Sequence, residues 1–251
     1  MGQRIALISA LHEELAEVLA LMPDEHKIDH AGREFWQGHL HGHEVVAVCS
    51  GMGKVAAAAT TATLLARFEI DQVIFTGVAG GLQPGVEVGD IVVSHTVLQH
   101  DMDASPLYPR HELPGYGTAR LPTDLALSQV LAEAAKDTIT WLPKLLDEET
   151  LRAFGLHSPS VHRGLLITGD HFVATVAESD ALRAELPEAL AVDMEGAAVV
   201  QVCRDHGVPC AVVRTVSDRA DNSAHLDFQH FLGQIARHYS GRMIRKALNL
   251  L

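Results

Sequence analysis

Short apolar, β-compatible runs alternate along the chain with longer segments in which apolar residues recur every three or four positions. The runs predict buried strands, and the longer periodicity predicts amphipathic helices. The predicted strands are residues 4–9, 35–40, 44–50, 72–76, 91–99, 163–168, 189–193 and 209–217. The predicted helices are residues 12–22, 54–68, 124–136, 195–206 and 228–250. Strands that alternate with helices predict an α/β fold, with a largely parallel sheet covered on both faces.

Two stretches interrupt this alternation. Residues 102–122 contain Pro106, Pro109, Pro114 and Pro122, so we expect an irregular excursion on the surface. Loops of this length often carry function or a subunit contact. Residues 138–159 contain apolar side chains that suggest one small extra helix, to which the sequence assigns no role.

Composition and charge restrict the class of protein. The chain has 251 residues and is 47% hydrophobic, enough for one substantial core, and no segment resembles a linker, so we expect a single domain over residues 1–251. The net charge of -13 opposes binding to nucleic acid. No apolar segment approaches the roughly 20 residues of a membrane span, and no signal peptide is recognisable. With three cysteines, an odd number that favours free thiols, we expect a cytoplasmic protein.

Two stretches combine an apolar, strand-like start with an abrupt charged end. They are residues 191–198 (AVDMEGAA) and 212–221 (VVRTVSDRAD). In an open α/β sheet, such ends deliver functional groups into a crevice. Glu195, Arg214 and Asp218 beside Met194 would supply a sugar-hydroxyl acceptor, a cation, a proton-carrying carboxyl and an apolar surface, which are the parts of a nucleoside site. The alternative is that Glu195 only opens a helix and that Arg214 and Asp218 form an ion pair.

Glycine-rich and histidine-rich stretches could in principle bind phosphate or a metal. SGMGK at residues 50–54 and TGVAGGL at residues 76–82 do not have the spacing of a phosphate-binding P-loop, so they predict loops of close approach. His39, His41 and His43 would share one side of a strand. Because no acidic partner stands at a clear spacing, a solvated face is favoured over a metal site. We therefore expect neither a metal nor a cofactor.

Several motifs occur in an order that resembles the purine nucleoside phosphorylase superfamily. They are SGMGKVAA (50–57), TGVAGGL (76–82), VGDIVVS (88–94), GDHFV (169–173) and the two stretches with charged ends. IALISALHEE (5–14) and DRADNSAHLDF (218–228) narrow the resemblance to the 5'-methylthioadenosine/S-adenosylhomocysteine nucleosidase branch. The resemblance implies a single-domain, three-layer α/β/α fold with a central mixed twisted sheet, and a homodimer. It also implies hydrolysis of the N-ribosidic bond of adenine nucleosides with 5'-thioether substituents.

The resemblance assigns polar roles to five residues. Asp218, oriented by Ser217, would protonate adenine N7, which requires a raised pKa. Glu195 would accept hydrogen bonds from the ribose 2' and 3' hydroxyls and favour the cationic sugar. Glu14, helped by Arg214, would hold and deprotonate the attacking water. The alternative for Glu14 is an ordinary carboxylate at a helix N-terminus.

The resemblance also assigns the apolar walls of the substrate site. Phe172 would stack on adenine, and the backbone of Val173 would contact its polar edge. The remaining predicted wall residues are Leu11, Val78, Ala79, Gly80, Met194 and Phe228, with Leu107, Tyr108 and Pro114 from the excursion of a partner subunit. Val78 stands where the family commonly has serine, and Leu11 where methionine is common. For each apolar residue alone, an ordinary place in the core is the alternative.

Other functions remain open at this point. A phosphorylase would need several Arg or Ser donors for phosphate, whereas Glu14 repels phosphate and suits water. A binding protein without turnover would be expected to lack Glu14, Glu195 or Asp218, and all three are present. A nucleosidase acting on 6-amino-6-deoxyfutalosine is a further alternative. The candidate substrates share adenine and differ at the 5' end, so the sequence leaves the choice among them open.

Overall fold

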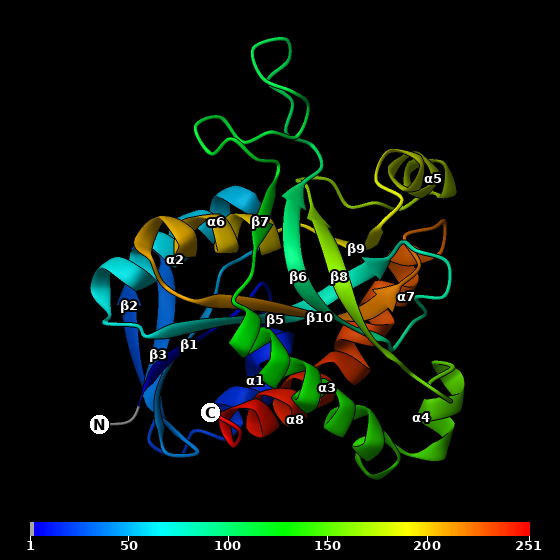
Figure 1. Cartoon of the computed structure of the whole chain (residues 1–251). Coiled ribbons are helices and arrows are strands. Elements are labelled where there is room, and N and C mark those ends of the chain that lie inside the picture. Colours follow the sequence, from blue (N-terminus) through cyan, green and yellow to red (C-terminus); the bar gives the residue numbers. More distant parts are fainter. Residues whose placement is uncertain (1–2) are drawn as a thin grey trace.

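The computed structural model describes residues 3–251 as a mixed β-sheet between two layers of helices (Figure 1). The strands are β1 (Arg4–Ser9), β2 (His26–His30), β3 (Arg33–Leu40), β4 (His43–Cys49), β5 (Gln72–Gly81), β6 (Ile91–Gln99), β7 (Arg120–Pro122), β8 (Val161–Thr168), β9 (Ala189–Asp193) and β10 (Cys210–Asp218). The helices are α1 (His12–Ala20), α2 (Lys54–Arg67), α3 (Leu125–Leu145), α4 (Glu148–Ala153), α5 (Val176–Glu185), α6 (Gly196–His206), α7 (Ala224–Phe231) and α8 (Arg237–Leu248), with a π-helical turn at Leu232–Ala236.

The central strand, β5, pairs in parallel with both β1 and β10. Ile8 of β1 and Val212 of β10 both lie opposite Phe75 of β5, so the three strands run in register. Their carboxyl ends therefore meet at one edge of the sheet. On the other side of β1, the strands β4, β3 and β2 follow in that order, and β2, β3 and β4 are joined by antiparallel pairings.

Five strands of the sheet also form a closed ring of pairings that begins and ends at β5. β10 pairs with β6, β6 with β8, β8 with β9, and β9 returns to β5 where Gly80 lies opposite Val192. The prediction of a largely parallel sheet was therefore wrong, because the sheet combines parallel and antiparallel strand pairings. β5 continues to Gly81 where a loop was expected after Thr76, and this extension makes the closing pairing possible.

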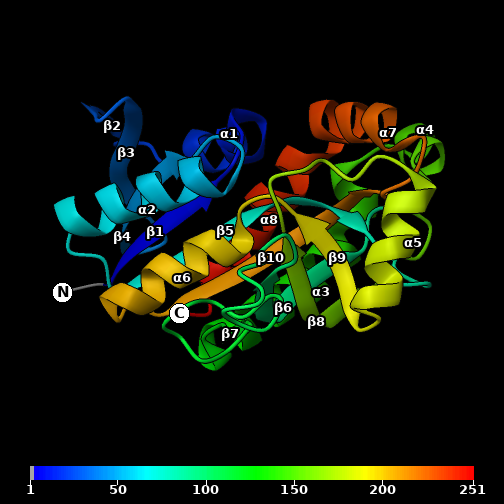
Figure 2. The same ribbon diagram turned by 90° about the horizontal axis from the view of Figure 1, so that it is seen from above.

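The two helical layers bury opposite faces of the sheet, which confirms the predicted three-layer α/β/α architecture. α2 and α6 lie side by side on one face (Figure 2), and their core includes Leu64 and Val199 together with Phe75. On the other face, the core formed with α1, α3 and α8 includes Leu131 and Tyr239. Adjacent strand residues therefore contribute to different cores, as the two-residue period of a strand requires.

Several elements differ from their predicted bounds. β2, β7 and α5 were not predicted, since β2 is polar and largely exposed and β7 is very short. α3 extends to Leu145, beyond the predicted end at residue 136, and α4 is the small extra helix. The closing helical segment begins at Ala224, before the predicted start at Phe228. Across the described residues, no helix combines the length and the apolar composition that a membrane span requires.

Candidate active site

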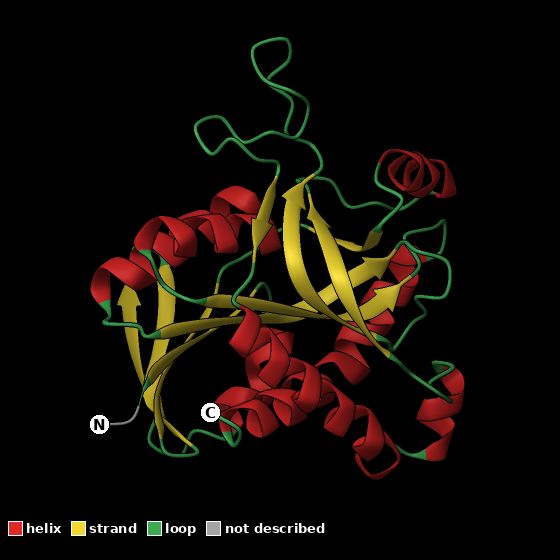
Figure 3. Ribbon diagram, viewed as in Figure 1, coloured by secondary structure: helices red, strands yellow, loops and turns green. Residues whose placement is uncertain are grey.

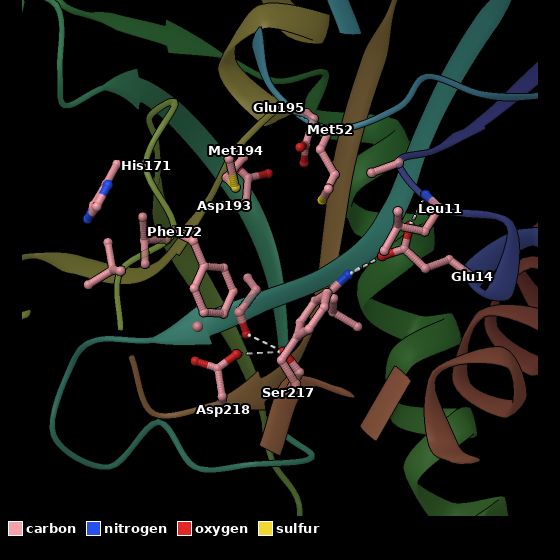
Figure 4. A pocket seen from close by; sticks show the side chains of 17 residues that line it. Leu11, Glu14, Met52, His171, Phe172, Asp193, Met194, Glu195, Ser217 and Asp218 are labelled. Carbon is pink, nitrogen blue, oxygen red and sulfur yellow. Dashed lines mark hydrogen bonds between the residues drawn. The ribbon is translucent and has the colours of Figure 1, made fainter. Parts of the chain in front are cut away.

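A pocket opens at the edge where the central strands end, and it encloses about 560 Å³ including its mouth (Figure 4). Figure 4 shows Glu14 approaching from the side of α1, Asp218 with Ser217 from the end of β10, and Glu195 with Met194 from the segment after β9. Asp193 lines the same cavity, so the fold brings together four acidic side chains from separate parts of the sequence.

Glu14 is buried and is held by two backbone groups. Leu11 N donates to its Oε2 at 2.9 Å, and Val78 N donates to its Oε1 at 2.9 Å. Burial raises the pKa of Glu14, while the nearby Arg214 charge and the backbone donors oppose this shift. Glu14 lies in the first turn of α1, in agreement with the alternative interpretation of a carboxylate at a helix N-terminus. It also contacts β5 and lines the pocket.

Glu195 lies between the end of β9 and the start of α6. Gly53 N donates to Glu195 Oε1 at 2.9 Å, and Arg214 Nη2 lies 3.8 Å from Glu195 Oε2. Burial, reinforced by the neighbouring Asp193 charge, raises the pKa of Glu195 to about 7, and Arg214 opposes the shift. Near neutral pH this side chain can therefore change between its two protonation states.

Asp218 ends β10 and is buried at the other side of the pocket. Ser217 Oγ donates to Asp218 Oδ2 at 2.8 Å, and Ala220 N donates to Asp218 Oδ1 at 2.9 Å. Burial raises the pKa of Asp218 to about 6, although both hydrogen bonds favour the charged form. A carboxyl with this pKa can carry a proton close to neutral pH, which an acid catalyst requires.

Arg214 does not line the pocket; it is 1% exposed and lies behind the pocket wall. Its Nε donates to Asp193 Oδ2 at 2.9 Å, its Nη2 lies 2.8 Å from the same oxygen, and its guanidinium lies 3.9 Å from the centre of the Phe75 ring. Arg214 thus pairs with Asp193 and, more distantly, Glu195, and not with Asp218 as the alternative interpretation proposed.

Asp193 is the main acidic residue that the sequence analysis missed. Besides Arg214, it accepts hydrogen bonds from Thr168 Oγ1 at 2.6 Å and from Gly196 N at 3.0 Å. One signal could have revealed it. An arginine in the middle of a buried strand requires a buried acidic partner, and Asp193 ends another apolar strand.

The glycines of β5 allow these charged groups to approach the strand. A Cβ atom on Gly77 would lie 2.6 Å from Glu14 Oε1 and 2.7 Å from Arg214 Nη1, and one on Gly80 would lie 3.0 Å from Asp218 Oδ1. The two contacts at Gly77 are shorter than real Cβ atoms show, and the contact at Gly80 is tighter than most. The loop of close approach predicted at residues 76–82 is therefore part of a strand, and the close approach occurs along β5.

The predicted apolar residues of this subunit also line the pocket. The rings of Phe172 and Phe228 meet edge to face with their centres 5.5 Å apart. The other predicted lining residues are Leu11, Val78, Ala79, Gly80, Val173 and Met194. Ala10, Met52, His171, Val192 and Asp193 line the pocket without having been predicted. Each of the five lies within a quoted motif, which is the signal that could have found them.

Leu107, Tyr108 and Pro114 do not line the pocket of their own subunit. The excursion that carries them projects from the body of the molecule, and Leu107 is 84% exposed (Figure 3). Their assignment to the pocket of a partner subunit stays a prediction.

The histidines considered for metal binding lie in other surroundings. His39 Nδ1 lies 2.7 Å from Asp24 Oδ2, and His43 Nε2 lies 3.0 Å from the carbonyl oxygen of Leu248. Within residues 3–251, no three or more His, Cys, Asp or Glu side chains are grouped so that they could hold a metal ion.

The fold and the pocket place the chain in a known class of proteins. The family model described as the phosphorylase superfamily matches residues 4–249. A 5'-methylthioadenosine/S-adenosylhomocysteine nucleosidase of Chromohalobacter salexigens is 38% identical over 94% of this chain and 93% of its own length. The chain therefore belongs to the phosphorylase superfamily and, within it, to the family of 5'-methylthioadenosine/S-adenosylhomocysteine nucleosidases.

Solved structures agree with this assignment. The nucleosidase of Neisseria meningitidis in complex with methylthio-immucillin-A is 31% identical, with a TM-score of 0.86 over 99% of this chain and 100% of that chain. The futalosine hydrolase of Helicobacter pylori is 30% identical, with a TM-score of 0.85 over 99% of this chain and 98% of that chain.

Proposed function

We propose that this protein hydrolyses the N-ribosidic bond of 5'-methylthioadenosine and S-adenosylhomocysteine, releasing adenine and the thioribose. One observation carries the proposal: Glu14, Glu195 and Asp218 line a single pocket together with Phe172. The names of the similar nucleosidases point to the same substrates.

The reaction divides between the two ends of the pocket. Asp218 donates its proton to adenine N7, so the bond between N9 and C1' breaks with its electron pair on the base. The ribose becomes cationic, and Glu195, which accepts hydrogen bonds from its 2' and 3' hydroxyls, favours this charge. Glu14 takes a proton from water while the water oxygen bonds to C1'. Return of that proton to Asp218 through solvent completes the cycle.

Arg214 supports this chemistry from behind the wall. It lies 3.8 Å from Glu195, and its charge favours the ionised forms of both Glu195 and Glu14. Because Arg214 lies outside the pocket lining, we assign it to positioning the carboxylates and not to contact with the water.

Phosphorolysis is the less favoured alternative. A phosphate nucleophile needs several cationic or hydroxyl donors around it. Of the described residues that line the pocket, none is Lys or Arg, and the nucleophile side carries the Glu14 carboxylate. Water is therefore the nucleophile that the pocket suits.

A related hydrolysis remains a second candidate. The likeness to a futalosine hydrolase favours 6-amino-6-deoxyfutalosine as an alternative substrate, since it would present the same adenine and ribose to the same acids. The two candidates differ only in the group at the 5' position.

We also propose a homodimer located in the cytoplasm, with a role in methionine salvage and nucleoside catabolism. The exposed apolar Leu107 and Tyr108 of the excursion support a subunit contact, and the free thiols of Cys49, Cys203 and Cys210 fit a reducing compartment.

Product identification tests the proposed reaction. The purified protein is incubated with methylthioadenosine in the presence and absence of inorganic phosphate, and the sugar product is analysed by mass. We expect adenine and free methylthioribose at equal rates in both conditions. A sugar phosphate, or a strict requirement for phosphate, would contradict hydrolysis, and faster turnover of 6-amino-6-deoxyfutalosine would favour the second candidate.

A further inference from the structure

The N-terminal end of α2 lies against two acidic side chains from separate segments. Gly53 N donates to Glu195 Oε1 at 2.9 Å, and Lys54 N donates to Asp170 Oδ1 at 2.7 Å. α2 has no capping side chain of its own. The two carboxylates thus bind amide groups that the first turn of a helix leaves free, where the helix dipole also favours negative charge.

Asp170 belongs to the irregular segment that carries the adenine-stacking residue, Phe172. The segment from residue 169 to residue 175 is neither strand nor helix, so no ladder of backbone hydrogen bonds fixes it. At its first end, Asp170 N donates to Asp101 Oδ2 at 2.9 Å, and Lys54 Nζ lies 2.5 Å from Asp101 Oδ1. Asp170 is therefore connected to α2 both directly and through Asp101.

The other end of this segment is anchored separately. Glu178 of α5 accepts hydrogen bonds from Thr175 Oγ1 at 2.8 Å and from Ala174 N at 3.2 Å, and its Oε1 lies 2.8 Å from His171 Nε2. These contacts do not involve α2. The two anchors of the segment therefore differ in one respect: only Asp170 is connected to the helix end that holds Glu195.

We propose that Asp170 is a positioning residue that fixes the adenine side of the pocket relative to the ribose side. Its side chain holds the first turn of α2, whose Gly53 amide in turn holds Glu195, and its backbone fixes the start of the segment with Phe172. The fit at this point is close, because a Cβ atom on Gly53 would lie 3.1 Å from Asp170 Oδ1. The inference rests on the proposed function, which gives Glu195 and Phe172 their ligand contacts.

Three variants separate this role from general stability. Asp170→Ala removes the acceptor for Lys54 N, so the turn that holds Glu195 loosens. Asp170→Asn keeps an acceptor oxygen at the same place and should restore the wild-type behaviour, since Asn caps helices about as well as Asp. Glu178→Ala is the matched control, because it loosens the same segment at the end that does not contact α2.

The experiment measures how much the ribose 2' hydroxyl contributes to the affinity of each variant for a nucleoside. The probes are 7-deaza-5'-methylthioadenosine and its 2'-deoxy counterpart, which lack the N7 atom that accepts the proton and so allow binding without turnover. Calorimetry gives the ratio of their dissociation constants. In the wild type we expect the 2'-deoxy probe to bind about tenfold more weakly, as for one lost hydrogen bond to a charged group.

In Asp170→Ala, the ratio should fall to about threefold or less, while Asp170→Asn and Glu178→Ala should keep the wild-type ratio. Both alanine variants should bind free adenine more weakly. A wild-type ratio in Asp170→Ala would overturn this inference and leave the proposed function intact. A wild-type protein that does not discriminate the two probes would overturn the ribose role of Glu195 and the inference together. If Asp170→Ala does not fold, Asp101→Ala loosens the same contact indirectly, and an unchanged ratio in that variant would overturn the inference.

Discussion

Glu14, Glu195 and Asp218 are buried in the pocket, and burial favours the neutral form of each. The pKa of Glu195 is raised to about 7 and that of Asp218 to about 6, and the pKa of Glu14 is also raised. A buried carboxylate that must ionise costs folding free energy. The carboxyl groups that the proposed chemistry needs therefore lower the stability of the fold when they ionise.

Glu195→Gln should lose activity and gain stability. The folded pKa of about 7 lies above the usual 4.5. Below pH 4.5 Glu195 is neutral in both states and costs nothing. As the pH rises towards 7, the unfolded chain ionises first, so the wild type loses stability that the variant keeps. We expect a gain of about 1–3 kcal/mol at pH 8.

Thermal melting of Glu195→Gln and wild type at pH 5 and pH 8 measures this difference. The melting temperature of the variant should exceed that of the wild type clearly at pH 8 and much less at pH 5. A variant that melts below the wild type at pH 8 would show that the ionised side chain stabilises the fold.

Asp218→Asn should lower turnover of methylthioadenosine by at least about 100-fold, because an amide can contact N7 but cannot donate the proton. In the wild type, kcat/KM should fall as the pH rises above about 6, since Asp218 then loses its proton. The residual activity of the variant should lack this decline. Circular dichroism checks that the variant is folded, and activity within a few fold of the wild type would exclude Asp218 as the acid.

The sequence predicted the side chains that line the pocket better than the contacts behind them. Glu14, Glu195 and Asp218 each stand in a continuous motif at the end of a strand, so local pattern was sufficient. Asp193, which also lines the pocket, pairs with Arg214, and Asp170 pairs with Lys54; both partners are distant in the sequence. Such pairs depend on how strands are ordered in the sheet, which periodicity does not determine.

At the scale of the elements, β5 organises the pocket. Its glycines lie where Glu14, Arg214 and Asp218 approach the strand, and its final residues pair with β9. The glycine-rich run after Thr76, which lacks P-loop spacing, predicted a loop of close approach. In the structure this run is a strand, and the absence of side chains on its glycines makes room for the charged groups.

Gly77→Ala should therefore damage both activity and stability. Its methyl group would meet Glu14 and Arg214 at distances that force them apart. We expect kcat for methylthioadenosine to fall at least about tenfold and the fold to lose about 1–3 kcal/mol, as for other overpacked sites. Gly233→Ala is the control, because its methyl group would have no neighbour within 4 Å. Equal activity and melting temperature in the two variants would contradict the role of Gly77.

The elements themselves were largely predictable where their burial is one-sided or complete. β1, β6 and α6 match their predicted bounds within a residue. β2 and α5 are mostly exposed, so neither produces a strong apolar period. The closure of the sheet through β9 depends on pairings between distant strands and has no local signal.

At the scale of the whole molecule, the excursion between β6 and β7 projects from the body of the chain (Figure 3). Leu107 and Tyr108 are exposed there, at 84% and 38%. An irregular loop with exposed apolar side chains is expected to be covered in an assembly. We therefore expect it to close the 5'-substituent pocket of a second subunit.

Changing Leu107 and Tyr108 together to Ala should raise KM for methylthioadenosine more than KM for adenosine, because only the former carries the thioether that the loop would contact. Leu125→Ala, at an exposed apolar side chain of α3, is the control and should change neither KM. An equal rise for both nucleosides would contradict the proposed contact, and so would a fully active monomer in sedimentation at assay concentrations.

The central claim is that the pocket holds substrate while Glu14 activates water, and one variant tests it most directly. Glu14→Gln keeps the size of the side chain and removes the base. We expect kcat for methylthioadenosine to fall at least about 100-fold, while a cationic ribose mimic binds within a few fold of its wild-type affinity. Glu13→Gln, at the exposed neighbouring position, should behave as wild type. Loss of binding as complete as the loss of turnover would contradict the account, because Glu14 would then serve the structure and not the water.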